Sequence, residues 1–301
     1  MMRFIRFKNK LNFKQDINSA QAIFMNANFI KDIAIERVTL ELCKILNECN
    51  SKAIEDLSYF GILDHIIPEL EDGLGCEQPP QFHPEGDVWD HTMLTLDKMK
   101  EINKSYVTLW AALLHDVGKP AVQTWDEEDK RFRFNNHDTK SAEMAKVILT
   151  RLKFSNQFID HICNLIAQHM KFQNVQILRL SKLKRFVLQD NFQDHLDLHK
   201  ADCLASHGID ENYEFCKKKW TEFLTEQPEI SFPKPIFTGD DLIELGFIPN
   251  PKFKEMLDYL MDGQLEHAFT DKNSAIQYLA QKYLLIPCVV NGVKYEIGSQ
   301  K

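Results

Sequence analysis

The amino-acid sequence predicts an all-α protein, because three observations agree. Apolar residues recur at spacings of three and four, the period of a helix face, over residues 33–46, 142–152, 158–170 and 257–265. Alternating patterns typical of strands are sparse. At 301 residues and 44% hydrophobic, the chain is long enough to bury a large core and has room for about two domains.

Composition and charge exclude several classes of protein. The net charge of −8 argues against indiscriminate nucleic-acid binding, although a local basic patch is compatible with it. Seven cysteines are scattered without a Cys-x-x-Cys pair, which is typical of a reducing compartment and not of a disulfide framework or a zinc ribbon. No stretch approaches the roughly 18 apolar residues of a membrane span, and no signal peptide is evident. We therefore expect a cytoplasmic protein that does not contact a membrane.

Three stretches punctuate the helical pattern. Residues 73–86 contain Pro-Pro and His-Pro-Glu-Gly steps and predict a loop before the central part of the chain. Residues 228–235 form a second break, after which Thr238 is expected to cap a helix starting at Asp240. Near the end of the chain, Asn-Gly between apolar alternations predicts a short β-hairpin over residues 288–297.

The most informative stretch is WAALLHDVGKP, residues 110–120, in which an apolar helical run delivers His115 and Asp116 side by side. Neighbouring residues on a helix point about 100° apart, so an imidazole and a carboxylate reach one cation together only near a helix end. The alternative interpretation is a buried histidine followed by an aspartate that caps a helix.

Four further candidate ligands are spread across the middle of the chain: His91, His137, His169 and Asp202. Their spacing places each on a different helix, so that a helical bundle holds the ligands on separate rigid arms. Mixed imidazole and carboxylate ligands favour divalent ions such as Mn, Fe, Co, Ni or Mg, whereas structural zinc more often recruits thiolates.

At this point the sequence resembles a known family. The segments HPEGDVWDHT (83–92) and LLHDVGKP (113–120), the Asn136-His137 step, Gln168-His169 and Ala201-Asp202 are similar to the HD-superfamily phosphohydrolase domain carried by bacterial tRNA nucleotidyltransferases, the CCA-adding and poly(A) polymerase family. The resemblance covers roughly residues 1–284. It implies a helical neck-like segment over residues 1–75, an HD-domain helical bundle over 76–227 and a helical tail with the hairpin over 228–301.

The resemblance also implies a ligand set and its chemistry. The metal ligands would be His91, His115, Asp116, His137, His169 and Asp202, with Asp116 bridging if two divalent ions are present instead of one. Asp116 and Lys119 are the catalytic candidates, Lys119 by meeting the developing charge of a phosphate. The alternative for Lys119 is a lysine at a helix C-terminus that faces the helix dipole.

Motifs of the family's catalytic head, namely the Gly-Ser strand motif, the paired aspartates and Glu-Asp-x-x-Arg, are missing from the sequence. The resemblance then implies a metal-dependent phosphohydrolase: a phosphatase, 2'-nucleotidase or 2',3'-cyclic phosphodiesterase that acts on nucleotides or RNA ends. The alternative is an RNA-binding subunit of a split tRNA nucleotidyltransferase, which binds tRNA and docks onto a separate nucleotidyltransferase head through residues 1–70.

Substrate contacts and a rival metal site complete the candidates. His83 and Glu85 lie on the expected approach loop, and Lys182 and Arg185 belong to a basic run that either follows a phosphate backbone or forms a solvated helix face. The rival site consists of His195, His199 and Asp202, which share one helix face at positions i, i+4 and i+7. The resemblance favours Asp202 alone as the ligand from this helix.

Overall fold

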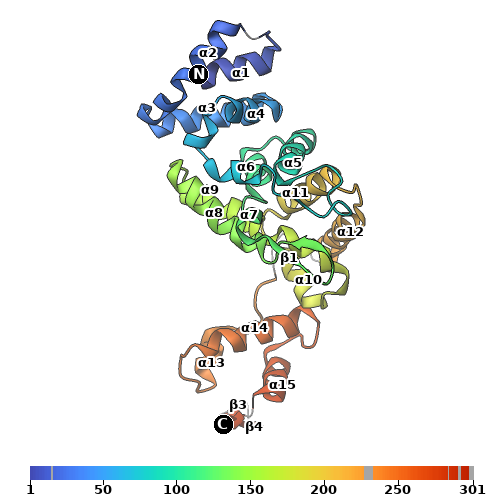
Figure 1. Ribbon diagram of the computed structural model, residues 1–301. Coiled ribbons are helices and arrows are strands. Elements are labelled where there is room, and N and C mark those ends of the chain that lie inside the picture. Colours follow the sequence, from blue (N-terminus) through green and yellow to red (C-terminus); the bar gives the residue numbers. More distant parts are fainter. Residues whose placement is uncertain (15, 227–232, 284, 291–292, 298–301) are drawn as a thin grey trace. The chain divides into compact units, whose positions relative to one another are not determined.

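The computed structural model describes residues 1–14, 16–226, 233–283, 285–290 and 293–297. Within these residues the secondary structure is predominantly helical, which confirms the predicted all-α class (Figure 1). The chain divides into two compact units, Met1–Gln173 with Gln193–Phe215 and Asn174–Phe192 with Cys216–Lys301. The three segments predicted from the sequence remain a prediction.

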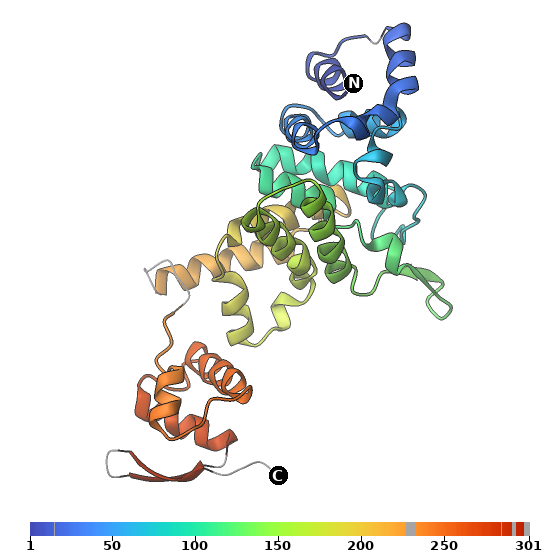
Figure 2. The ribbon, with the colours of Figure 1, turned by 90° about the vertical axis from the view of Figure 1, so that its left-hand side faces the viewer.

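The N-terminal part of the first unit packs helix on helix. Its elements are α1 (Met2–Leu11), α2 (Ile17–Asn26), η1 (Ala27–Asp32), α3 (Ile35–Glu48), α4 (Lys52–Tyr59), η2 (Leu63–His65) and η3 (Pro68–Gly73). Helix α1 lies against α3 and α4 (Figures 1 and 2). The buried Arg6 pairs with Glu48 at 2.7 Å, and Lys8 pairs with Asp56 at 2.8 Å. These N-terminal basic residues therefore stabilise the helix packing.

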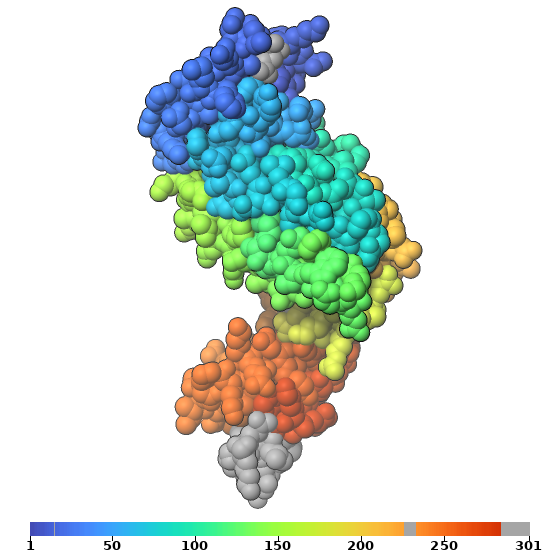
Figure 3. All heavy atoms as spheres, in the orientation of Figure 1, coloured from blue at the N-terminus to red at the C-terminus, as the bar shows by residue number. Residues whose placement is uncertain are grey.

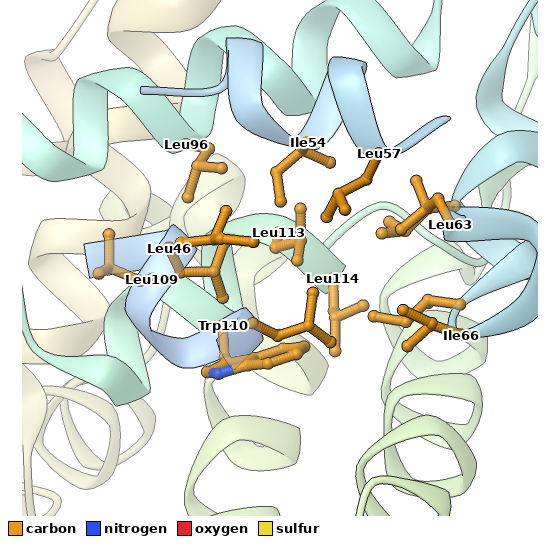
Figure 4. Packing of buried hydrophobic residues seen from close by; sticks show 14 of the residues in the cluster. Leu46, Ile54, Leu57, Leu63, Ile66, Leu96, Leu109, Trp110, Leu113 and Leu114 are labelled. Atoms are coloured by element: carbon orange, nitrogen blue, oxygen red, sulfur yellow. The ribbon is translucent and has the colours of Figure 1, made fainter. Parts of the chain in front are cut away.

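The central bundle of the first unit surrounds one helix that is buried from Thr108 to Leu114. Its helices are α5 (Val88–Ile102), α6 (Tyr106–Leu114), α7 (Lys119–Val122), α8 (His137–Arg151), α9 (Asn156–Gln168), η4 (His169–Ile177) and α11 (Phe192–Ala205). Helix α6 starts at the cap Ser105, whose hydroxyl accepts from the backbone N–H of Thr108, and every residue from Thr108 to Leu114 is buried. Trp110 lies in the core among leucines and isoleucines of α3, α4, α5 and η2 (Figure 4).

A short β-hairpin between α7 and α8 was not predicted from the sequence. Strands β1 (Thr124–Asp126) and β2 (Arg131–Arg133) pair antiparallel, with Trp125 opposite Phe132. Each strand has three residues and carries charged side chains, which is too short for an alternating pattern to stand out. The hairpin projects from the helices of the first unit (Figure 2) and is exposed on the face seen in Figure 3.

The second unit has its own small core. Its elements include α10 (Leu180–Val187), the later part of α12 (Glu211–Glu226), α13 (Gly239–Glu244), α14 (Lys252–Leu265), α15 (Lys272–Lys282) and the strands β3 (Leu285–Val290) and β4 (Val293–Ile297). Buried Phe237, Leu242 and Leu260 belong to this core.

Two predictions from the sequence concern this unit. Thr238 caps α13 in a reciprocal capping box with Asp241, as expected, and the helix starts at Gly239, one residue earlier than predicted. The antiparallel pairing of β3 with β4 confirms the terminal hairpin, although the predicted turn at 291–292 lies outside the described residues.

Two further observations bear on the expected cellular setting. Six cysteines are free thiols in the structure: Cys43, Cys49, Cys76, Cys163, Cys203 and Cys216. Among the described residues, none of the helices combines the length and the apolar character that crossing a membrane requires. The cytoplasmic location stays a prediction.

The core around α6 makes a measurable prediction on α3. Leu46 is fully buried, whereas Leu40 on the same helix is 57% exposed. We expect Leu46→Ala to lower the free energy of unfolding by about 2–5 kcal/mol, because the cavity left in the core is only partly closed. The matched control Leu40→Ala should change it by less than about 0.5 kcal/mol. Urea unfolding followed by far-UV circular dichroism measures both; equal losses would contradict the described packing.

Candidate metal centre

Six polar side chains from five separate helical elements converge in the first unit. His91 lies within α5, His115 is the C-cap of α6 with Asp116 directly after it, His137 is the first residue of α8, His169 is the C-cap of α9, and Asp202 lies on α11. The expectation that the ligands come from different helices is thus met in the geometry. The four histidines and Asp116 are all buried.

Asp116 occupies the centre of this cluster. Its Oδ2 lies 2.7 Å from Nζ of Lys119 and 3.2 Å from Nε2 of His115. Its Oδ1 lies 3.3 Å from Nε2 of His137 and 3.8 Å from Nε2 of His169. The carboxylate therefore joins two groups of potential ligands, one with His91 and His115 and the other with His137 and His169.

Helix ends fix the orientation of three of the imidazole rings. Nδ1 of His115 donates to the carbonyl oxygen of Ala112 at 2.9 Å, that of His137 to Phe134 at 2.8 Å, and that of His169 to Ile166 at 2.6 Å. Because a carbonyl oxygen only accepts, each Nδ1 carries the ring proton of the neutral imidazole. The Nε2 lone pairs of these three histidines are thereby directed at Asp116. Such backbone contacts are the usual way of orienting histidine ligands.

The group of His137, His169 and Asp116 fits a cation. Nε2 of His137 lies 3.1 Å from Nε2 of His169. Burial lowers the pKa of both rings, that of His169 to about 4, so both are neutral near pH 7 and present lone pairs to each other. Oδ1 of Asp116 is buried and accepts no hydrogen bond. The lone pairs of Nε2 of His137, Nε2 of His169 and Oδ1 of Asp116 therefore face one another with no proton to share, which is unfavourable. A divalent ion coordinated by all three atoms would remove this repulsion.

The group around His91 differs because it holds a proton. Burial alone would lower the pKa of His91, but Asp202, whose Oδ1 lies 3.1 Å from Nε2, and Glu85, whose Oε1 lies 2.6 Å from Nδ1, raise it to about 9. The His91 imidazolium in turn lowers the pKa of Asp202 against the effect of burial. An ion bound at Nε2 of His91 would have to displace this proton.

Lys119 is buried and bound on two sides. Its Nζ lies 2.7 Å from Oδ2 of Asp116 and donates to Oε1 of Gln78 at 2.6 Å. Lys119 is the first residue of α7 and follows the C-cap of α6, His115, by four residues. It neutralises one oxygen of Asp116 and leaves the other directed at His137 and His169. Its catalytic role stays a prediction.

Gly118 explains how the segment after α6 reaches α8. A Cβ at this position would lie 2.5 Å from the backbone nitrogen of Ser141, and the Gly118 N–H donates to Oγ of Ser141 at 2.9 Å. Only glycine permits this close approach. The contact brings the turn that carries Asp116 against the helix that starts at His137.

The predicted substrate contacts fall into two groups. His83 lines the cavity over the cluster, and its Nδ1 lies 2.8 Å from Oε1 of Glu85, which also contacts His91. Glu85 therefore orients His91, a function that the sequence analysis missed. Lys182 and Arg185 belong to the second unit, where Nε of Arg185 donates to Asp262 at 2.7 Å. Their role as substrate contacts stays a prediction.

The rival site on α11 is not assembled in the structure. Asp202 contacts His91 on α5, whereas His199 stacks on Phe172 with a centroid distance of 4.1 Å. Nε2 of His199 also lies 3.6 Å from Sγ of Cys203. His195 is buried, and neither His195 nor Asp202 belongs to the three ligand groups that the described residues form; Asp202 joins the cluster through its contact with His91 alone. The geometry favours the distributed ligand set.

The cluster opens into a cavity of about 490 Å³. Asp116, His137, His169, Asp202 and Lys119 line its floor, and residues 131–135 of the β1–β2 hairpin and the chain after it line a wall. Four of the predicted ligands are thus accessible to a small molecule. The wall was missed at the sequence level because the hairpin itself was missed.

Comparisons with known proteins support the resemblance. A family model described as "HD domain" matches residues 88–202, and one described as "Probable RNA and SrmB- binding site of polymerase A" matches residues 12–74. The A-adding tRNA nucleotidyltransferase of Deinococcus radiodurans is 30% identical over 280 residues, covering 87% of this chain and 63% of that protein. The CC-adding tRNA nucleotidyltransferase of Thermus thermophilus is 28% identical, covering 92% of this chain and 65% of that protein.

The solved structures extend the similarity to the fold. The crystal structure of the Bacillus stearothermophilus CCA-adding enzyme in complex with CTP matches 94% of this chain and 61% of that chain, with a TM-score of 0.61 and 17% identity. At this identity the match concerns the fold alone. The chain spans 63–65% of the length of the two curated relatives.

The ligand geometry predicts a metal content that can be measured without any assay of activity. We expect the purified protein to bind a divalent ion and His169→Ala to lower its metal-to-protein ratio, because one of three facing acceptors is lost. His199→Ala is the matched control, since His199 is also buried but lies outside the cluster. Elemental analysis after dialysis against Mn²⁺ tests both variants. The same ratio in wild-type protein and His169→Ala would contradict the assignment.

Proposed function

We propose that this chain is the tRNA-binding part of an enzyme of the tRNA nucleotidyltransferase type. The observation that carries the proposal is the extent of similarity: 87–92% of the chain aligns with an A-adding and a CC-adding enzyme. The match of residues 12–74 to an RNA-binding family supports it. A nucleotidyltransferase head, on the same polypeptide or on a separate one, would supply the nucleotide-adding site.

Binding of tRNA is the direct test. We expect the chain to bind a tRNA that lacks its 3' CCA sequence, with an affinity that falls as salt rises because lysines and arginines neutralise phosphates. Lys182 is exposed on α10, and Lys182→Ala should reduce the slope of log affinity against log salt by about 1 if it contacts a phosphate. Lys146→Ala, at an exposed position of α8, is the matched control.

Fluorescence anisotropy of labelled tRNA at several salt concentrations measures both quantities. Binding no tighter than that of an unrelated RNA hairpin would overturn the proposed function. An unchanged slope in Lys182→Ala, with tRNA binding intact, would remove only Lys182 from the contact surface.

A second function is proposed for the HD centre itself: metal-dependent hydrolysis of phosphate esters on nucleotides or RNA ends. The observation that favours it is the set of three inward-facing acceptors, His137, His169 and Oδ1 of Asp116, at the floor of an accessible cavity. A pure binding module gains nothing from burying such groups unpaired. One or two divalent ions held here would polarise a phosphoryl oxygen and lower the pKa of a water.

The protein's own groups have separate tasks in this reaction. His115, His137 and His169 are held by backbone carbonyls and cannot rotate away from Asp116 without losing those bonds. Lys119 lines the cavity, and its ammonium group, held by Asp116 and Gln78, would add positive charge near a phosphate bound there. His83 lines the same cavity, and burial lowers its pKa, so near neutral pH its ring is available to accept a proton.

Replacement of the central carboxylate tests this function. We expect Asp116→Asn to lower the hydrolysis of a 2',3'-cyclic nucleotide more than tenfold, because the ligand common to both groups loses its charge and metal catalysis accounts for several kcal/mol. Far-UV circular dichroism should remain that of the folded protein. Asp64→Asn, at an exposed position, is the control. If Asp116→Asn, assayed with the same divalent ion, kept more than about a tenth of the wild-type activity, the hydrolytic function would be contradicted.

A further inference from the structure

The cavity over the cluster has a neighbour of similar size. The second cavity measures about 550 Å³ and shares Pro79, His83, Arg131 and Phe132 with the first, so the two lie side by side along the β1–β2 hairpin. A cavity of about 300–1,000 Å³ is large enough for one small-molecule ligand. Two adjoining cavities of this size therefore have room for more than one nucleotide.

Exposed aromatic rings line this double cavity. Phe82 on the loop before α5 is 47% exposed, and Trp125 on β1 is 48% exposed. The Trp125 ring meets Phe132 edge to face, with 5.1 Å between their centroids, and this contact holds the two strands together. The pairing leaves about half of the indole uncovered at the cavity wall, and hairpin packing makes no use of that surface. Flat exposed rings of this kind are the surfaces on which unpaired bases stack.

The charged side chains around these rings favour binding of single-stranded nucleic acid over a duplex. The Arg131 guanidinium lies 5.3 Å from the Phe82 ring centroid and donates to Asp129 at 3.2 Å. Arg133 donates to Asp126 at 2.8 Å and also contacts Asp129. The arginines of the hairpin are thus largely neutralised by the acidic turn at 126–129. A duplex bound over this turn would bring its phosphates against carboxylates, whereas stacking of a few bases needs little positive charge.

We propose that the double cavity receives the single-stranded end of an RNA, with the terminal phosphoester at the cluster of candidate ligands and neighbouring bases stacked on Phe82 and on Trp125. This inference rests on the proposed hydrolytic function of the same site. It narrows the substrate class from nucleotides or RNA ends to RNA ends of two or more nucleotides. Phe82 and Trp125 are then specificity-determining residues for the base next to the reacting nucleotide.

The kinetic test measures the hydrolysis of two substrates by the 301-residue chain loaded with Mn²⁺. One is a pentanucleotide with a terminal 2',3'-cyclic phosphate, and the other is bis(4-nitrophenyl) phosphate, which has no base. We expect Phe82→Ala and Trp125→Thr each to lower the ratio of the two kcat/KM values about tenfold, since stacking contributes roughly 1–3 kcal/mol per base. Tyr106→Ala, an exposed aromatic residue at the start of α6 outside both cavities, should leave the ratio unchanged.

A binding experiment tests whether bases stack on Phe82 and Trp125 even if the chain hydrolyses neither substrate. We expect a single-stranded pentanucleotide with a 3'-hydroxyl end to quench tryptophan fluorescence, and Trp125→Thr to remove most of that quenching. Because Phe82 lies on a loop and not in a strand, Phe82→Ala serves as the second variant if Trp125→Thr unfolds the hairpin; it should weaken binding of the same oligonucleotide.

The outcomes separate the two ideas. If the metal-loaded protein hydrolysed neither substrate but the pentanucleotide still quenched its fluorescence, the hydrolytic function would be rejected. The binding of single-stranded RNA by Phe82 and Trp125 would still be supported. A mononucleotide that binds as tightly as the pentanucleotide would overturn the RNA-end proposal. So would wild-type ratios and wild-type binding in both Phe82→Ala and Trp125→Thr.

Discussion

The buried carboxylate of Asp116 is the constraint on which the first unit depends. Lys119 satisfies one of its oxygens at 2.7 Å, and the other faces two neutral histidines and accepts no hydrogen bond. A charge in this position is tolerated only where opposite charge surrounds it. The fold supplies part of that charge through Lys119, and a cation bound between Asp116, His137 and His169 would supply the rest.

Helix ends do most of the positioning. His115 and His169 stand at the C-terminal ends of α6 and α9, where unpaired backbone carbonyls are available to receive the Nδ1 protons. Helix α6, buried from Thr108 to its end, fixes the first of these ends because its close packing in the core holds it in place. Gly118 then lets the chain turn closely against α8 and presents His137 from the opposite side. The packing of the core therefore also sets the orientation of the candidate ligands.

The two proposed functions concern different surfaces and are compatible in one chain. Binding of tRNA is supported by similarity that extends over nearly the whole sequence, including residues 12–74. Hydrolysis is supported by the two groups of potential ligands that share Asp116, within the residues that match the HD family model, and by the contact of Asp202 with His91. The proposed stacking of bases on Phe82 and Trp125 would connect the two functions, because it would let the candidate metal centre prefer RNA ends to free nucleotides.

The sequence alone determined the helical class and the capped start of α13, because helical periodicity and capping residues are local signals. The six candidate ligands are spread over residues 91–202, and the resemblance to a known family, not a local pattern, singled them out as one set. Only the tertiary structure decided which partners those residues have. Glu85 behind His91, Gln78 beside Lys119 and the stacking of His199 on Phe172 join residues whose spacing carries no pattern. The β1–β2 hairpin escaped prediction because three-residue strands are stabilised by pairing across the turn, and that pairing exists only in the folded chain.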